Sequence, residues 1–160
     1  MTAEPIDVTE LSSHATIVAT LTDSWPSVGL GLYVTVFDAA LGRLLIASGQ
    51  PDQARDRLDA ALRFAEESGM HFYEAELLRL RAHTHADPDL TREDLSAARE
   101  LAGRQGMHLF ELRAALDDFD LHGEPARAAV IDVVSRIPAA SSLPELTRAQ
   151  AALELNPSSD

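Results

Sequence analysis

The chain has 160 residues, of which 46% are apolar and 24% charged, as expected for one globular domain with a substantial core. Acidic residues outnumber Lys and Arg by 26 to 13, and the net charge of −13 disfavours binding to nucleic acid or to anionic membrane surfaces. Cysteine is absent, which excludes disulfides, thiolate metal ligands and cysteine nucleophiles.

The first residues are polar and show no signal-peptide pattern, so we expect residues 1–11 to be loose and the protein to be cytoplasmic. Ser12 or Ser13 is suited to cap a short leading helix that extends to Asp23. Trp25 and Pro26 then break this helix. The longest apolar run, residues 28–37, is too short to span a bilayer.

Residues 30–37 form the one stretch whose intrinsic propensity favours a strand, because β-branched and aromatic side chains dominate it. In the 37-residue repeat described below, residues 35–45 match residues 72–82, where good helix formers stand at nearly every position. Since propensity is a weak guide against tertiary packing, we predict a helix over residues 29–47.

The rest of the chain alternates between helical patterns and turn signals. Helices are predicted over residues 51–68, 72–85, 91–105, 108–121, 125–137 and 144–155. Thr91 is the predicted cap of the helix over residues 91–105. A Ser/Pro/Ala linker covers residues 138–142, and residues 156–160 are expected to be a disordered tail.

The turns recur at a fixed interval. Pro51, Pro88 and Pro125 stand 37 residues apart (51 to 88 and 88 to 125). The segment Gly-Met-His-Phe-Tyr-Glu at 69–74 returns as Gly-Met-His-Leu-Phe-Glu at 106–111. A period in the thirties is typical of a solenoid of helix pairs, so we predict an all-α fold with one domain over residues 12–155.

The spacing of small and apolar residues within each unit resembles the tetratricopeptide (TPR) pattern. The matching positions are Leu41, Gly42, Leu45, Gly49, Ala54, Leu58 and Ala61 in the first unit, Leu78, Ala82, Thr91, Leu95 and Ala98 in the second, and Ala115, Phe119, Gly123 and Ala128 in the third. The unit is about three residues longer than the roughly 34 residues of the family. The resemblance implies about three antiparallel helix pairs with a leading and a C-terminal capping helix.

A narrower resemblance involves residues 72–81, 98–106, 111–115 and 142–153. These segments are similar to the C-terminal TPR-like region of large bacterial signalling ATPases, such as LuxR-type regulators and multidomain adenylate cyclases. The chain has no Gly-Lys phosphate loop, cyclase segment or basic DNA-reading helix, so only the helical interaction module is implied.

In such a module the first helix of each pair lines the concave face. The resemblance therefore implies a partner-binding face made by Tyr73, Glu76, Leu80, His83, Phe110, Arg113, Asp117 and Asp120. The alternative is that these are ordinary packing and solvated residues, and both explanations stay open here. The Lys/Asn clamp that some TPR domains use for C-terminal carboxylates cannot be assembled, because Asn156 in the tail is the only asparagine.

The histidines do not predict a metal site. His83 and His85 are two residues apart and lie on nearly opposite sides of a helix, so they cannot share a metal from that element. His71 and His108 occupy equivalent turn positions, which indicates a repeated structural role.

The acidic residues Asp117, Asp118, Asp120 and Glu111 form the one cluster that could serve acid/base catalysis or bind a divalent cation. A solvated acidic helix face explains the same spacing, and no serine lies in a nucleophile context. We therefore predict no enzyme, no catalytic residue, no metal and no cofactor.

The function we expect is a non-enzymatic scaffold that binds another protein or a peptide, in bacterial regulation or signalling. A second hypothesis is a self-associating homodimer, formed through the apolar residues 28–37. A hydrolase or metal enzyme that uses the Asp and His residues is a more distant alternative.

Overall fold

The computed structural model describes residues 13, 17, 20, 31–138 and 141–155. Its regular structure in these ranges is helical, with no strand in them: α2 (Gly31–Ala47), α3 (Pro51–Ser68), the short 3₁₀ helix η2 (His71–Tyr73), α4 (Glu74–Ala82), α5 (Pro88–Arg104), α6 (His108–His122), α7 (Glu124–Arg136) and α8 (Pro144–Leu155). The predicted all-α class is confirmed for the described residues. The predictions of a loose start, a leading helix to Asp23 and a disordered tail lie outside them, apart from Ser13, Ile17 and Thr20, which are helical.

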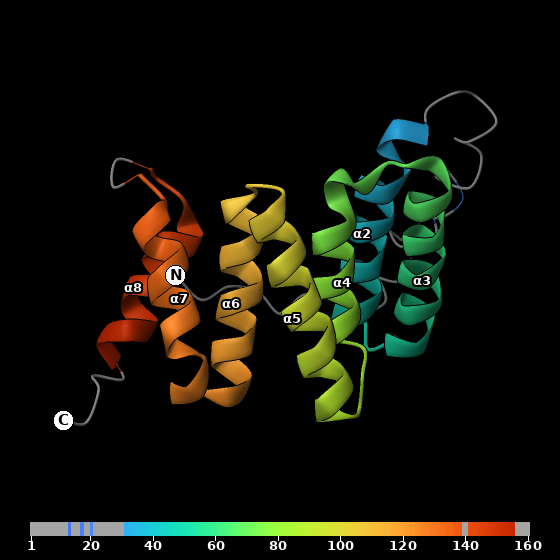
Figure 1. The fold of residues 1–160 in the computed structure, drawn as a ribbon. Helices are drawn as coiled ribbons and strands as arrows, with labels where there is room; N and C mark the ends of the chain where they lie inside the picture. The colour runs from blue at the N-terminus through green and yellow to red at the C-terminus, as the bar shows by residue number, and fades with distance from the viewer. Residues whose placement is uncertain (1–12, 14–16, 18–19, 21–30, 139–140, 156–160) are drawn as a thin grey trace.

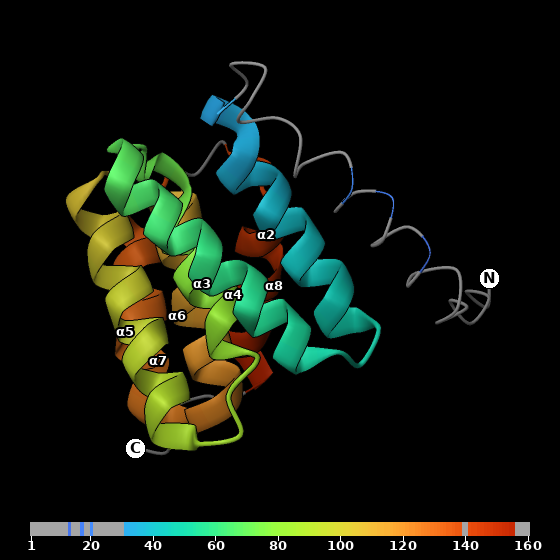
Figure 2. The ribbon, with the colours of Figure 1, turned by 90° about the vertical axis from the view of Figure 1, so that its right-hand side faces the viewer.

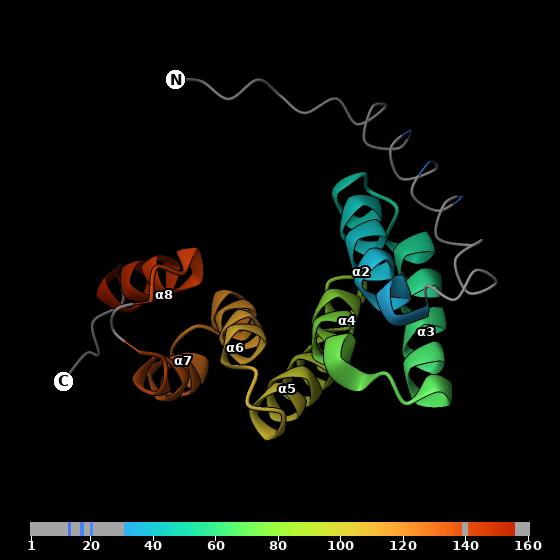
Figure 3. The ribbon, with the colours of Figure 1, turned by 90° about the horizontal axis from the view of Figure 1, so that it is seen from above.

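The helices pack in sequence order and lie side by side (Figures 1 and 2). Viewed from above, α2, α4, α6 and α8 follow one curve, and α3, α5 and α7 lie outside it (Figure 3). We call these sets the inner row and the outer row. Each inner helix contacts the next inner helix as well as its outer neighbours, so side chains between inner helices can connect distant parts of the chain.

The helix α2 covers the stretch whose propensity favoured a strand. Val34, Ala39 and Leu41 are buried in it, and Ala39 packs in a core cluster with Leu58 and Leu77 of the next helices. Packing against α3 and α4 therefore outweighs the local preference for β structure, as predicted. The predicted start at residue 29 lies outside the described residues, which resume at Gly31.

The two Gly-Met-His turns, at residues 69–71 and 106–108, have the same backbone geometry. Gly69 and Gly106 have φ of 72° and 68°, the left-handed conformation that glycine adopts without steric cost. The next N–H donates five residues back in both turns, from Met70 to the Ala65 carbonyl at 3.1 Å and from Met107 to the Ala102 carbonyl at 2.9 Å. The repeated Gly-Met-His segment therefore marks the C-terminal ends of two helices, α3 and α5, that terminate in the same way.

Two predicted helix ends were wrong. The third predicted helix ends at Ala82 rather than His85, because the N–H groups of His83 and Thr84 bond carbonyls three residues back, and the Thr84 hydroxyl donates to the Arg81 carbonyl at 2.7 Å. The following helix begins at Pro88, three residues before Thr91.

Asp87, rather than Thr91, caps that helix. Its side chain accepts a hydrogen bond from the Asp89 N–H at 2.9 Å. Thr91 lies inside the first turn, and its hydroxyl donates to the carbonyls of Asp87 at 3.0 Å and Ala82 at 3.4 Å.

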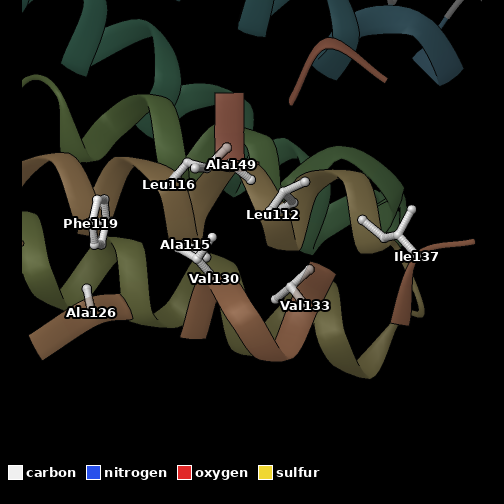
Figure 4. Packing of buried hydrophobic residues seen from close by; sticks show 9 residues of the cluster. All are labelled: Leu112, Ala115, Leu116, Phe119, Ala126, Val130, Val133, Ile137 and Ala149. Carbon is white, nitrogen blue, oxygen red and sulfur yellow. The ribbon is translucent and has the colours of Figure 1, made fainter. Parts of the chain in front are cut away.

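The largest core cluster joins α6, α7 and α8. Val130 and Val133 of α7 face Ala115 of α6, and Ala149 of α8 approaches α6 near Leu116 (Figure 4). Apart from Phe119, the buried residues of this cluster are small or branched, namely Ala, Val, Leu and Ile. The core therefore continues to the last helix, which packs against both α6 and α7.

Candidate functional site

Charged side chains connect all four helices of the inner row. We call this set the inner-face network, and it consists of Arg43 of α2, Glu76 and Arg79 of α4, His83 after α4, Arg113, Asp117 and Asp120 of α6, and Glu145 and Arg148 of α8. Five of the eight residues predicted for a partner-binding face belong to it: Glu76, His83, Arg113, Asp117 and Asp120.

Glu76 is the centre of the network. Its side chain is 0% exposed, and its Oε1 atom accepts from Arg79 at 3.0 Å and from Arg43 at 3.2 Å. Arg113 Nη1 lies 3.5 Å from the same oxygen. Guanidinium groups from α2, α4 and α6 therefore share one buried carboxylate. Together they compensate its negative charge.

Asp117 is the second buried carboxylate, with a side chain that is 6% exposed. Arg79 donates to its Oδ2 atom, His83 Nε2 lies 2.7 Å from the same atom, and Arg148 Nη2 lies 3.3 Å from Oδ1. Burial alone would raise the pKa of Asp117, but the hydrogen bond with His83 and the charge of Arg79 lower it by more, to about 2. Asp117 is therefore ionised at neutral pH.

The network continues to α8 through two pairs. Arg113 Nε donates to Glu145 Oε1 at 2.7 Å, and Arg148 donates to Asp120. Burial acts to raise the pKa of Glu145, and the hydrogen bond from Arg113 lowers it by more. Burial acts to lower the pKa of Arg148, and Asp120 and Asp117 raise it by more. Both pKa shifts favour the charged forms of Glu145 and Arg148 at neutral pH.

Aromatic rings lie near the N-terminal ends of α4 and α6, the two middle helices of the inner row. The ring centroids of Tyr73 and Phe110 are 5.1 Å apart in an edge-to-face arrangement, and those of Phe72 and Tyr73 are 5.7 Å apart. The Arg113 guanidinium carbon lies 5.9 Å from the Phe110 ring centre. Tyr73 and Phe110 are half-buried, so these rings join the network to the core while keeping one side in solvent.

The structure divides the predicted face residues by exposure. Leu80 is in the core with Leu77 and Leu58, so ordinary packing describes it. Asp117 was also explained as part of a solvated acidic face, and for this residue that explanation is wrong because its side chain is buried. For Asp120 it holds, since its side chain is 55% exposed.

Four network members were not predicted: Arg43, Arg79, Glu145 and Arg148. Arg79 and Arg148 stand three residues after Glu76 and Glu145, a spacing that places opposite charges on one helix face and could have indicated them. Arg43 gave no such signal, because its partner Glu76 is 33 residues away in the chain.

Other ion pairs connect inner helices to outer ones. Arg81 donates to Asp59 at 3.0 Å and to Asp94 at 2.6 Å, and His85 Nε2 lies 2.8 Å from Asp94. His83 and His85 thus have different carboxylate partners, but both lie after the end of α4 and not on opposite sides of a helix as predicted.

The equivalent histidines His71 and His108 have the same contact. Each lies near the glutamate three residues later, with Nδ1 at 2.9 Å from Glu74 and at 3.4 Å from Glu111. The repeated structural role predicted for them is confirmed.

The described residues hold no group of three or more His, Asp or Glu side chains arranged to bind a metal ion. None of the helices in the described ranges combines the length and the apolar character needed to cross a membrane. Comparison of the chain with protein-family models, with curated proteins and with solved structures gave no match.

Proposed function

We propose that this protein is a non-enzymatic, TPR-like scaffold that binds another protein or a peptide on its inner row, in the bacterial cytoplasm. The turns repeat with the period of the sequence, and alternate helices fall into two rows, as in a solenoid of helix pairs. Solenoids of this kind present the curved inner row as an extended binding surface.

The observation that carries the proposal is the inner-face network. Its buried carboxylates Glu76 and Asp117 hold arginines whose outer parts reach solvent, since Arg43 is 58% and Arg148 is 45% exposed. Side chains fixed by buried partners lose less conformational entropy when a partner binds than free surface side chains do. The inner row is therefore a preorganised polar surface.

The same geometry disfavours the hydrolase alternative. A general base that works at neutral pH needs a pKa near 7, and the pKa of Asp117 is about 2 because His83 and Arg79 hold its charge. Glu76 is covered by guanidinium groups and is 0% exposed, so a substrate would have to displace arginines to reach it.

Self-association remains a second candidate, because Tyr33 of α2 is a large apolar side chain that is 52% exposed. Light scattering over micromolar concentrations decides it. A dimer that the Tyr33→Ser variant converts to a monomer would support it, and a wild-type monomer throughout would reject it.

The scaffold is tested by capture of partners from a bacterial lysate with the wild-type chain and two double variants. Arg43→Gln with Asp120→Asn changes the inner row, and Arg92→Gln with Asp89→Asn changes α5 of the outer row. Both variants leave the net charge unchanged, and all four side chains are more than half exposed.

We expect the inner-row variant to lose a captured protein that the outer-row variant retains. Equal capture by all three proteins, with unchanged helix content, would contradict binding on the inner row.

A further inference from the structure

Most carboxylates of the inner-face network are buried and two of its arginines are exposed. Glu76, Asp117 and Glu145 are 0%, 6% and 16% exposed, whereas Arg43 and Arg148 are 58% and 45% exposed. The exceptions are Asp120, which is 55% exposed, and Arg79 and Arg113, which are 13% and 26% exposed. Along these residues an approaching molecule therefore meets two exposed arginines, Arg43 and Arg148, and one exposed carboxylate, Asp120, although the chain as a whole is acidic.

Arg43 is incompletely neutralised. Glu76 is its one ion-pair partner in the described part of the chain, and the same carboxylate also serves Arg79 and Arg113. Arg43 donates to it through Nη2 alone, which leaves Nε and Nη1 without an acceptor among the described residues. A guanidinium has five N–H donors in a planar fork that matches a carboxylate, so Arg43 has donors to offer.

Arg148, on α8 at the other end of the row, has two carboxylate partners but also has donors without an acceptor. It reaches Asp117 and Asp120 through Nη2, and no acceptor for its Nε or Nη1 is described. Because Arg43 is on α2 and Arg148 is on α8, the available donors stand at both ends of the inner row.

The net charge of −13 does not decide which partner binds here. At physiological ionic strength the Debye length is about 8 Å, and a helix with its side chains is about 10 Å wide. Exposed carboxylates on the outer row, such as Asp89, are therefore largely screened from a ligand on the inner row. On the inner row the ligand meets Arg43 and Arg148 directly, together with Asp120, which pairs with Arg148.

We propose that the inner row recognises an extended segment of a partner protein through acidic side chains of that segment, which pair with Arg43 and Arg148. This inference rests on the proposed function and names the chemistry of its partner. The half-buried rings of Tyr73 and Phe110 give the same segment an apolar contact. The buried carboxylates position the arginines and do not themselves touch the partner.

The test uses fluorescence anisotropy at 150 mM salt with three labelled peptides of one length, each with a central Phe and with blocked ends. One is rich in Glu, one has Gln at the same positions and one has Lys. Blocked ends ensure that a C-terminal carboxylate cannot supply the signal. We expect the Glu peptide to bind and the other two to bind at least about tenfold more weakly.

The protein variants are Arg43→Gln with Arg148→Gln on the inner row and Arg63→Gln with Arg92→Gln on the outer row. The control removes the same charge from two exposed arginines. In the first variant Glu76 still pairs with Arg79 and Arg113, and Asp117 still pairs with Arg79 and His83. Because these buried ion pairs are retained, we expect the variant to fold. We expect about tenfold weaker binding of the Glu peptide in the inner-row variant and a change within about twofold in the control.

Equal binding of the Glu and Gln peptides by the wild-type protein would overturn the inference whatever the variants do. Tighter binding of the Lys peptide, or equal losses in the two variants, would overturn it as well. If lysate capture depends on the inner row while the Glu peptide does not bind, the scaffold stands and the acidic partner is rejected.

Discussion

At the scale of single residues, the inner-face network combines charges that are costly to bury. Replacing a buried ion pair by apolar groups is often neutral or stabilising, whereas removing one partner leaves an uncompensated charge. We therefore expect Glu76, which is shared by Arg43, Arg79 and Arg113, to contribute more to the register of α2, α4 and α6 than to net stability.

Asp117 predicts a specific acid sensitivity. Its pKa is lowered from 3.8 to about 2 in the folded protein, so the folded state keeps the charge to lower pH than the unfolded state. The stabilisation, about 2 kcal/mol, is complete above about pH 4 and is lost as the pH falls toward 2. Urea unfolding of the wild-type protein and the Asp117→Asn variant from pH 6 to pH 2.5 measures it.

We expect the Asp117→Asn variant to lose this part of the pH dependence. The Asp120→Asn variant is the control, because Asp120 shares Arg148 with Asp117 but is largely exposed. An Asp117→Asn variant whose stability falls with acid as steeply as the wild type would contradict the assignment.

Thr35 and Thr91 give a matched pair of buried hydroxyls. Thr35 is fully buried, and its hydroxyl has no hydrogen-bond partner within the described ranges, whereas the Thr91 hydroxyl bonds two carbonyls. Thr35→Val removes an unsatisfied polar group and should stabilise the protein by about 1 kcal/mol. Thr91→Val should destabilise it by about 1 kcal/mol.

Thermal and urea unfolding of both variants provide the measurement. Destabilisation at both positions would show that the Thr35 hydroxyl is bonded in solution.

At the scale of helices, the closest approach of α2 and α3 is made by a glycine. A Cβ atom added to Gly42 would lie 2.8 Å from Leu58 Cδ2 and 3.0 Å from its Cγ, and Leu58 is fully buried. Gly42→Ala should therefore destabilise the protein by about 1 kcal/mol, because overpacking exceeds the gain in helix propensity.

The sign should reverse when Leu58 is shortened. In a Leu58→Ala background the clash is gone, and Gly42→Ala should stabilise the protein by about 1 kcal/mol through helix propensity alone. Urea unfolding of the four proteins closes this double-mutant cycle. An effect of the same sign in both backgrounds would show that the two helices do not meet at this pair.

Local signals predicted most helix limits, because glycines and prolines mark the turns regardless of tertiary context. Gly69 and Gly106 were identified from the repeat, and both are left-handed. The errors arose where side chains compete for backbone groups. Asp87 and Thr91 are both good caps, and the choice between them depends on where α4 ends and releases the Ala82 carbonyl to Thr91.

At the scale of the whole molecule, the two rows determine which residues meet. The residues predicted for the binding face lie on or beside α4 and α6 of the inner row, but they differ in exposure, because the spacing along one helix does not reveal what the neighbouring helix contributes. Nothing in the sequence around Glu76 indicates that Arg43 and Arg113 will pair with its carboxylate. Leu80 likewise lies on an inner helix and still points into the core.

The central claim is that the inner row holds a partner and the outer row does not. NMR titration of the labelled chain with the Glu-rich peptide tests it most directly, because every backbone amide reports separately. We expect shifts concentrated in α2, α4, α6 and α8, with the side-chain Nε–H signals of Arg43 and Arg148 among the largest. Shifts concentrated in α3, α5 and α7, or no shifts with this peptide or with any partner captured from lysate, would contradict the claim.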